Sequence, residues 1–168
     1  AWVNGQVLNI SDIANSLGIS VNTAKRYIDF MENAYLIRRL YPMWTNLKKR
    51  LVKSPKIYIR DTGILHYLLG INEFENLMAT PAFGHSWEGF VIQEIVANLP
   101  LSMEMYFYRT HNGSEADLVL TRGINTIAAI EIKISDSPVL TRGNTIAYSD
   151  LNAMFNFVIT PSSDDYLM

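Results

Sequence analysis

Apolar residues near the start of the chain recur at the spacing of amphipathic helices. Between Ser11 and Asn33 they lie three or four positions apart on either side of Gly18, which predicts two helices that meet at a short turn. Ser11 is the expected N-cap of the first helix and Ser20 that of the second, while Gly18 can adopt the positive φ that ends a helix. Such a short connection is typical of a helix-turn-helix, because it makes the helices cross and leaves one face of the second exposed.

Two β-prone runs, residues 35–40 and 56–60, come next and flank a basic stretch. The second run alternates like a strand, and Ser54-Pro55 supplies a turn before it. The pattern predicts a β wing, so residues 1–70 are expected to form a winged helix-turn-helix that closes with an apolar helix. Residues 71–84 have little periodicity and are interpreted as a linker or an irregular helix.

The rest of the chain combines one helical pattern with several strand patterns. A helix is expected over residues 87–96, then three strands separated by turn signals, and a final strand after a helix or irregular segment at 140–154; the strands are 105–109, 116–120, 127–133 and 155–159. Gly143 lies in that segment and makes a regular helix doubtful there. The expected fold class is therefore mixed, α+β or α/β, with a winged helix followed over residues 85–168 by a sheet flanked by helices.

Composition narrows the class of protein. The 168 residues are 49% hydrophobic and 18% charged, which is enough apolar material for a core and argues against disorder. No apolar run approaches the roughly 18 residues of a spanning helix, so no membrane segment is expected. The absence of cysteine excludes disulfides and thiol chemistry. Because the chain starts at Ala1 without a leader pattern, it is interpreted as a fragment of a cytoplasmic protein.

Charge is segregated along the chain. Residues 1–60 carry a formal charge of +7 and residues 61–168 a charge of −9, which favours a basic module joined to an acidic one. DNA is the expected partner, and the side chains expected to meet phosphates or base edges are Asn22, Thr23, Lys25 and Arg26 on the second helix and Lys48, Lys49 and Arg50 on the wing. Two alternatives stay open: the basic hairpin simply pairs with an acidic face, or the winged helix docks a protein.

Acidic residues on two neighbouring predicted strands suggest metal chemistry. Asp117 and Glu131 are separated by one hairpin, and Lys133 lies on the same side of its strand as Glu131 because side chains alternate. Two carboxylates suit Mg²⁺ or Mn²⁺, and the ammonium group can orient or help deprotonate a water that attacks a phosphodiester. Glu88, on the preceding helix, supplies a third acid. We therefore expect a metal site of Asp117, Glu131 and Glu88, with Lys133 as a further catalytic residue.

The arrangement of Asp117, Glu131 and Lys133 after a helix carrying Glu88 resembles the PD-(D/E)XK restriction-endonuclease-like superfamily, with Ala116 where the motif has proline. The chain as a whole resembles the C-terminal region, a domain of unknown function, that follows the ATPase domain in a family of bacterial and archaeal AAA-type ATPases. The matching stretches include SLGISVNTAKRYIDFMENAYLIRRL, KRLVKSPKIYIRDTGILHYLLG, GHSWEGFVIQEI, YFYRTHNGSEADLVL and AIEIKIS. This resemblance implies a winged helix, a restriction-endonuclease-like mixed sheet and an ATPase domain upstream. No GxxxxGK[ST] occurs, so no ATP site of that kind is expected here.

Two functions follow from these residues. The first is a metal-dependent endonuclease that hydrolyses DNA phosphodiesters and is targeted by the winged helix. The second is a non-catalytic nucleic-acid- or protein-recognition module that regulates the upstream ATPase, in which Glu131 and Lys133 only form a salt bridge with Arg109. Glu94 and Glu115 are further acids outside the motif. A homo-oligomer is compatible with the sequence, which leaves open DNA against RNA, sequence preference and pathway.

Overall fold

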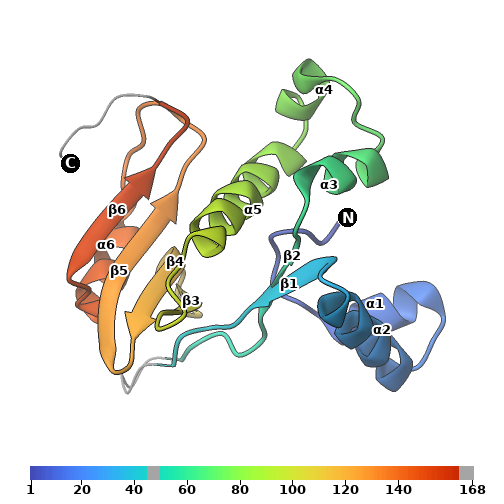
Figure 1. Cartoon of the computed structure of the whole chain (residues 1–168), viewed down its shortest axis with the longest axis horizontal. Coiled ribbons are helices and arrows are strands. Elements are labelled where there is room, and N and C mark those ends of the chain that lie inside the picture. Colours follow the sequence, from blue (N-terminus) through green and yellow to red (C-terminus); the bar gives the residue numbers. More distant parts are fainter. Residues whose placement is uncertain (45–49, 163–168) are drawn as a thin grey trace. The chain divides into compact units, whose positions relative to one another are not determined.

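The computed structural model describes residues 1–44 and 50–162. These residues form a mixed α+β structure with six helices and two separate sheets (Figure 1). The contacts divide the chain into two compact units, Ala1–Tyr41 with Lys53–Gln93, and Pro42–Val52 with Glu94–Met168. None of the helices in the described ranges is long and apolar enough to cross a membrane.

The first unit begins with the two expected helices. Helix α1 (Ile10–Leu17) ends at Gly18 in the left-handed conformation, and α2 (Val21–Asn33) starts at Ser20, whose side chain accepts a hydrogen bond from the Thr23 N–H at 3.1 Å. The expected cap of α1 was wrong. Asn9, not Ser11, caps that helix, because the Asn9 side chain accepts hydrogen bonds from two backbone N–H groups. The helix-turn-helix itself is as the apolar spacing predicts.

Strands β1 (Ile37–Leu40) and β2 (Lys56–Ile59) form an antiparallel pair that follows these helices. Apolar side chains from the chain start, α2 and both strands make the core of this unit, namely Leu8, Ile28, Ile37 and Ile57. Helix α3 (Thr62–Leu69) is capped by Asp61, and the short helix α4 (Phe74–Met78) follows. Helix α4 and the first residues of α5 (Ala82–Ala97) occupy positions 71–84, which the sequence predicts as a linker or an irregular helix.

The second unit is built on a four-stranded sheet of order β3-β4-β5-β6. Strands β3 (Glu104–Arg109), β4 (Glu115–Arg122) and β5 (Asn125–Ile132) are antiparallel, and β6 (Phe155–Ile159) runs parallel to β5. Residues 42–44 and 50–52 join this unit, because the Met43 N–H donates to the Phe107 carbonyl and the Val52 N–H to the Arg109 carbonyl.

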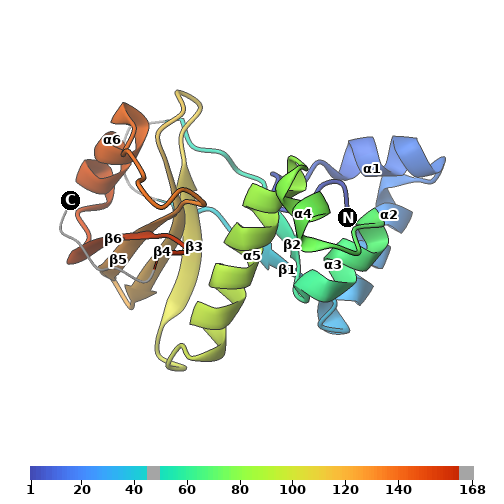
Figure 2. The same ribbon diagram turned by 90° about the horizontal axis from the view of Figure 1, so that it is seen from above.

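Helix α6 (Arg142–Leu151) covers one face of this sheet (Figure 2). It is regular despite Gly143, because Thr141 and Asn144 form a capping box at its start. A Cβ at position 143 would lie 2.7 Å from the Gly113 carbonyl oxygen, so glycine allows this close approach. The core between helix and sheet contains Leu51, Tyr108, Ala116, Val119, Ala129, Ala147 and Leu151. The α6 face of the sheet is thus a packed face, and the acidic residues lie at its end.

Candidate functional site

A β-bulge in strand β4 holds Asp117. Tyr106 pairs with Val119 and Tyr108 with Ala116, so that Asp117 and Leu118 lie opposite the single residue Phe107. The Asp117 side chain is 9% exposed, and its Oδ2 accepts a hydrogen bond of 3.0 Å from the Ile132 backbone N–H. Bulges redirect side chains and are common beside active sites. The carboxylate of Asp117 is thereby fixed at the end of β5, where the second acid lies.

Glu131, near the end of β5, is the most buried acid among the described residues of the second unit, at 1% exposure. Its Oε1 is 2.6 Å from Lys133 Nζ, whereas its buried Oε2 has no hydrogen-bond partner within residues 1–44 and 50–162. Burial, and then the negative charges of Asp117 and Glu115, raise the pKa of Glu131 to about 7, although Lys133 opposes the shift. Two carboxylates that lie close together repel each other when both are ionised, which favours the protonated form of the more buried one.

The same acidic residues change the pKa of Lys133. Burial lowers the pKa of its ammonium group, but the hydrogen bond to Glu131 and the charges of Glu131, Asp117 and Glu115 outweigh burial and raise it. Arg109 was expected to join the salt bridge of Glu131 and Lys133 in the non-catalytic alternative. In the structure Arg109 Nε lies 3.4 Å from Glu115 Oε2, across the β3–β4 pair. The Glu131–Lys133 ion pair of the non-catalytic alternative is present, and Arg109 pairs with Glu115.

Tyr148 on α6 is a site residue that the sequence analysis missed. Its hydroxyl donates a hydrogen bond of 3.0 Å to the Phe157 carbonyl of β6. Burial, followed by the charges of Glu131 and Asp117, raises the pKa of this phenol. Ala129, two residues before Glu131, packs against α6 on the same face of β5, which explains how a helix residue comes near the acids. A tyrosine within an irregular sequence pattern carries no motif that could have indicated this position.

Glu88 lies in the first unit, where neighbouring side chains contact both oxygens of its carboxylate. Its Oε1 accepts hydrogen bonds from Lys56 Nζ at 2.8 Å and from the Tyr58 hydroxyl at 2.6 Å, and its Oε2 lies 3.5 Å from His85 Nδ1. Both carboxylate oxygens of Glu88 are therefore engaged by neighbours from its own unit. Glu94 is exposed on α5. Across the described residues, no group of three or more His, Asp and Glu side chains is arranged to hold a metal ion. The carboxylates that the structure brings together are those of Asp117 and Glu131, with Glu115 nearby.

The residues expected to contact DNA are partly described. Asn22, Lys25 and Arg26 are exposed on α2, while Thr23 is half-buried and helps to cap the helix with Ser20. Arg50 is exposed and belongs to the second unit, where its carbonyl accepts a hydrogen bond from the His111 N–H. Lys48 and Lys49 lie outside the described residues. The exposed part of α2 therefore offers two cations and an amide on one helix.

Comparison with known proteins places the chain in a family. Residues 83–168, which contain Asp117, Glu131 and Lys133, match a domain of unknown function, DUF4143. The chain belongs to the DUF4143 family. Residues 1–75 match a second domain of unknown function, DUF8612, which covers the helix-turn-helix and the first sheet. The acidic pair thus lies in the DUF4143 part of the chain, and the exposed cations of α2 lie in the DUF8612 part.

Two mycobacterial proteins are similar over nearly the whole chain. They are the uncharacterised proteins Mb2031c of Mycobacterium bovis and Rv2008c of Mycobacterium tuberculosis, each 37% identical over 161 residues that make up 96% of this chain. The matched region is 36% of each relative, so this DUF4143 chain spans about a third of their length. No solved structure gives a significant match to the chain.

Proposed function

We propose that the second unit hydrolyses DNA phosphodiesters with Mg²⁺ or Mn²⁺, as a nuclease-like domain of the PD-(D/E)XK type, and that the helix-turn-helix of the first unit binds the DNA as a winged helix. The observation that carries the proposal is the pair Asp117 and Glu131. One carboxylate is fixed by a bulge, and the other has a buried oxygen without a hydrogen-bond partner in the described residues. Such an oxygen is a suitable ligand for a hard cation.

Each residue of this site would have its own role in hydrolysis. Asp117 and Glu131 would hold the cation, which supplies Lewis-acid stabilisation of the charge on the phosphate. Lys133 is 33% exposed and lies against Glu131, so its ammonium group can hold the attacking water or a phosphate oxygen beside the acids. The water loses a proton as its oxygen bonds to phosphorus, the bond from phosphorus to the leaving sugar oxygen breaks, and that oxygen takes up a proton in exchange. Tyr148, donating to the Phe157 carbonyl, holds α6 against β6 beside the acids.

Cleavage of supercoiled plasmid DNA with Mn²⁺ tests this proposal. The wild-type chain should nick or linearise the plasmid, and Asp117→Asn and Lys133→Met should each reduce the rate by at least 100-fold, because removal of a metal ligand or of the ammonium group removes transition-state stabilisation. Glu94→Gln, an exposed acid on α5, is the matched control and should cleave normally. Equal cleavage by Asp117→Asn and wild type, or no calorimetric Mn²⁺ binding at millimolar concentration, would sink the nuclease assignment.

A second function, recognition without catalysis on behalf of an ATPase elsewhere in the longer polypeptide, is supported by α2. The exposure of Asn22, Lys25 and Arg26 does not depend on the acidic pair. If these side chains bind duplex DNA, the logarithm of the affinity should fall with the logarithm of salt concentration by about 0.9 per phosphate contacted. Lys25→Glu with Arg26→Glu should weaken binding strongly. Binding that is insensitive to salt, or absent at low salt, would favour the docking of a protein instead.

A further inference from the structure

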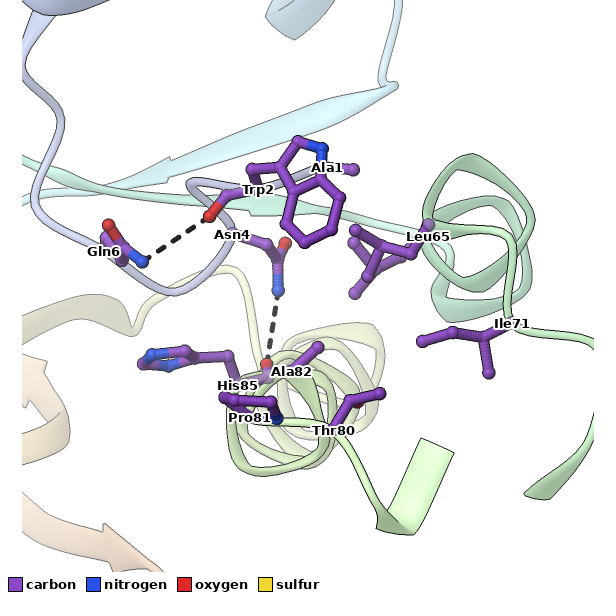
Figure 3. A pocket seen from close by; sticks show the side chains of 11 residues that line it. Ala1, Trp2, Asn4, Gln6, Leu65, Ile71, Thr80, Pro81, Ala82 and His85 are labelled. Carbon is purple, nitrogen blue, oxygen red and sulfur yellow. Dashed lines mark hydrogen bonds between the residues drawn. The ribbon is translucent and has the colours of Figure 1, made fainter. Parts of the chain in front are cut away.

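The first unit contains a cavity of about 400 Å³ between its N-terminal segment and helices α3 and α5 (Figure 3). The residues at its wall come from the N-terminal segment, α3, the stretch between α3 and α5, and α5 itself, all within this unit. The apolar ones are Ala1, Trp2, Leu65, Leu69, Ile71, Pro81 and Ala82. The cavity is distinct from the acidic pair, because every lining residue belongs to the first unit and the acids belong to the second.

Polar side chains at the wall are already used by the protein. Asn4 donates to the His85 carbonyl at 3.3 Å and accepts from the Ile59 N–H at 2.7 Å, and the Thr80 hydroxyl donates to the Leu77 carbonyl at 2.9 Å. The Nδ1 of His85 faces Glu88. Gln6 also lies at the wall, where it is exposed and donates to the Trp2 carbonyl at 3.5 Å. Because most lining residues are apolar and Asn4 and Thr80 are engaged, a charged or strongly polar molecule would lose more hydration than the wall replaces, and an apolar one would not.

The cavity is held in shape by the same contacts. Gly5 donates its N–H to the Ile57 carbonyl at 2.8 Å, and Asn4 joins the N-terminal segment to β2 and α5. Gly5 has φ +74°, and a Cβ there would lie 2.5 Å from His85 Nδ1, so the segment approaches α5 as closely as glycine allows. Since the walls are fixed before any ligand arrives, little ordering is needed for binding. Trp2 is the exception, because it is 82% exposed at the rim (Figure 3).

We propose that this cavity binds a neutral, largely apolar small molecule that contains an aromatic ring system. Its volume of about 400 Å³ is well above the ~150 Å³ of an engineered cavity that accepts benzene, and lies in the range of natural ligand pockets of about 300–1,000 Å³. A fused pair of rings therefore fits. The exposed indole of Trp2 supplies an aromatic surface against which such a ring can stack at the entrance. The proposal does not depend on nuclease activity.

Titration of the whole chain with the neutral fluorophore N-phenyl-1-naphthylamine tests the cavity. We expect saturable binding at a single site with micromolar affinity, and energy transfer from Trp2 to the bound probe. Trp2→Phe should keep most of the affinity and reduce that transfer, with Trp44 and Trp87 as the remaining donors. Saturable binding accompanied by unchanged energy transfer in Trp2→Phe would place the probe elsewhere and overturn the proposal.

Cavity-filling variants give the second arm of the test. Ala82→Phe and the smaller change Ala82→Leu add volume at the wall, and each should weaken probe binding, by at least 10-fold for phenylalanine. Ala79→Phe is the matched control, because Ala79 is exposed at the end of α4 and is not among the lining residues. Thermal melts followed by circular dichroism confirm folding of each variant. Full affinity in folded Ala82→Leu and Ala82→Phe, or equal weakening in Ala79→Phe, overturns the proposal.

Discussion

Replacement of Glu88 by glutamine removes the only negative charge in a group of four described side chains, three of which are buried. The carboxylate of Glu88 accepts from Lys56 and Tyr58, and lies beside His85. Glutamine keeps the shape of the side chain but removes the negative charge that lies 2.8 Å from the buried Lys56 ammonium. Breaking a buried pair in this way typically costs about 3–5 kcal/mol. At neutral pH we expect Glu88→Gln to reduce the free energy of unfolding by that amount.

The pH dependence of this loss follows from the pKa. Burial alone raises the pKa of Glu88, but His85, Lys56 and Tyr58 together outweigh burial and lower it from its ordinary 4.5 to about 2. Because the folded-state pKa is depressed, the stabilisation is complete above about pH 5 and is lost as the pH falls from 4.5 through 2. The shift corresponds to about 3 kcal/mol, of which about 2 kcal/mol is lost by pH 3.

Urea denaturation of wild type and Glu88→Gln at pH 7, 4 and 3 measures this difference. Other acids titrate in both proteins, so their effect cancels when the two free energies are subtracted at each pH. The difference should be largest at pH 7 and smaller by about 2 kcal/mol at pH 3. Glu75→Gln, an exposed acid on α4, should match wild type at every pH. A wild-type minus Glu88→Gln difference that does not change with pH would refute the assigned role of the ion network.

Three further predictions concern other parts of the molecule. Without metal, the raised pKa of Glu131, about 7, means that stability falls as pH rises from about 4.5 through 7, by about 3 kcal/mol, and Glu131→Gln should flatten this slope in urea titrations. Gly5→Ala should cost about 1–3 kcal/mol because of its positive φ and its contact with His85, whereas Gly123→Ala, with positive φ but open space around it, should cost less in the same assay; equal losses would refute the steric part. Asn144→Ala removes the hydrogen bond to the Glu115 carbonyl and the one from the Thr141 N–H, so we expect the free energy of unfolding to fall by about 1–3 kcal/mol. A melting temperature equal to that of wild type would contradict this.

The sequence predicted those elements whose patterns are local. Apolar spacing located the helices around Gly18, alternation located β2, and strand-like runs between turn signals located the strands of the second sheet, because each pattern is set by residues a few positions apart. The cap of α1 was wrong because Asn9 and Ser11 are both good caps, and two backbone N–H groups settle the choice in favour of Asn9. Helix α6 looked doubtful because Gly143 weakens a helix, and the gain from its capping box and close packing was not visible in the pattern.

The candidate site shows the same limit. Asp117, Glu131 and Lys133 could be selected from the sequence because the chemistry requires these residue types at strand spacing. The bulge at Asp117 depends on pairing with β3, and the position of Tyr148 depends on the packing of α6, so neither has a local signal. The partners of Glu88 come from a strand 30 and 32 residues earlier in the chain. Only the folded chain shows that Lys56 and Tyr58 already engage this acid.

The division of the chain also constrains how the protein can evolve. The backbone passes between the units at three points, after Tyr41, Val52 and Gln93. The segment Pro42–Val52 gives Leu51 to the core of the second unit, yet it lies within the stretch 1–75 that matches the DUF8612 domain. A recombination event with a single crossover would therefore separate a sheet from one of its own edge segments. The second unit therefore needs Leu51, a residue of the DUF8612 region, to complete its core.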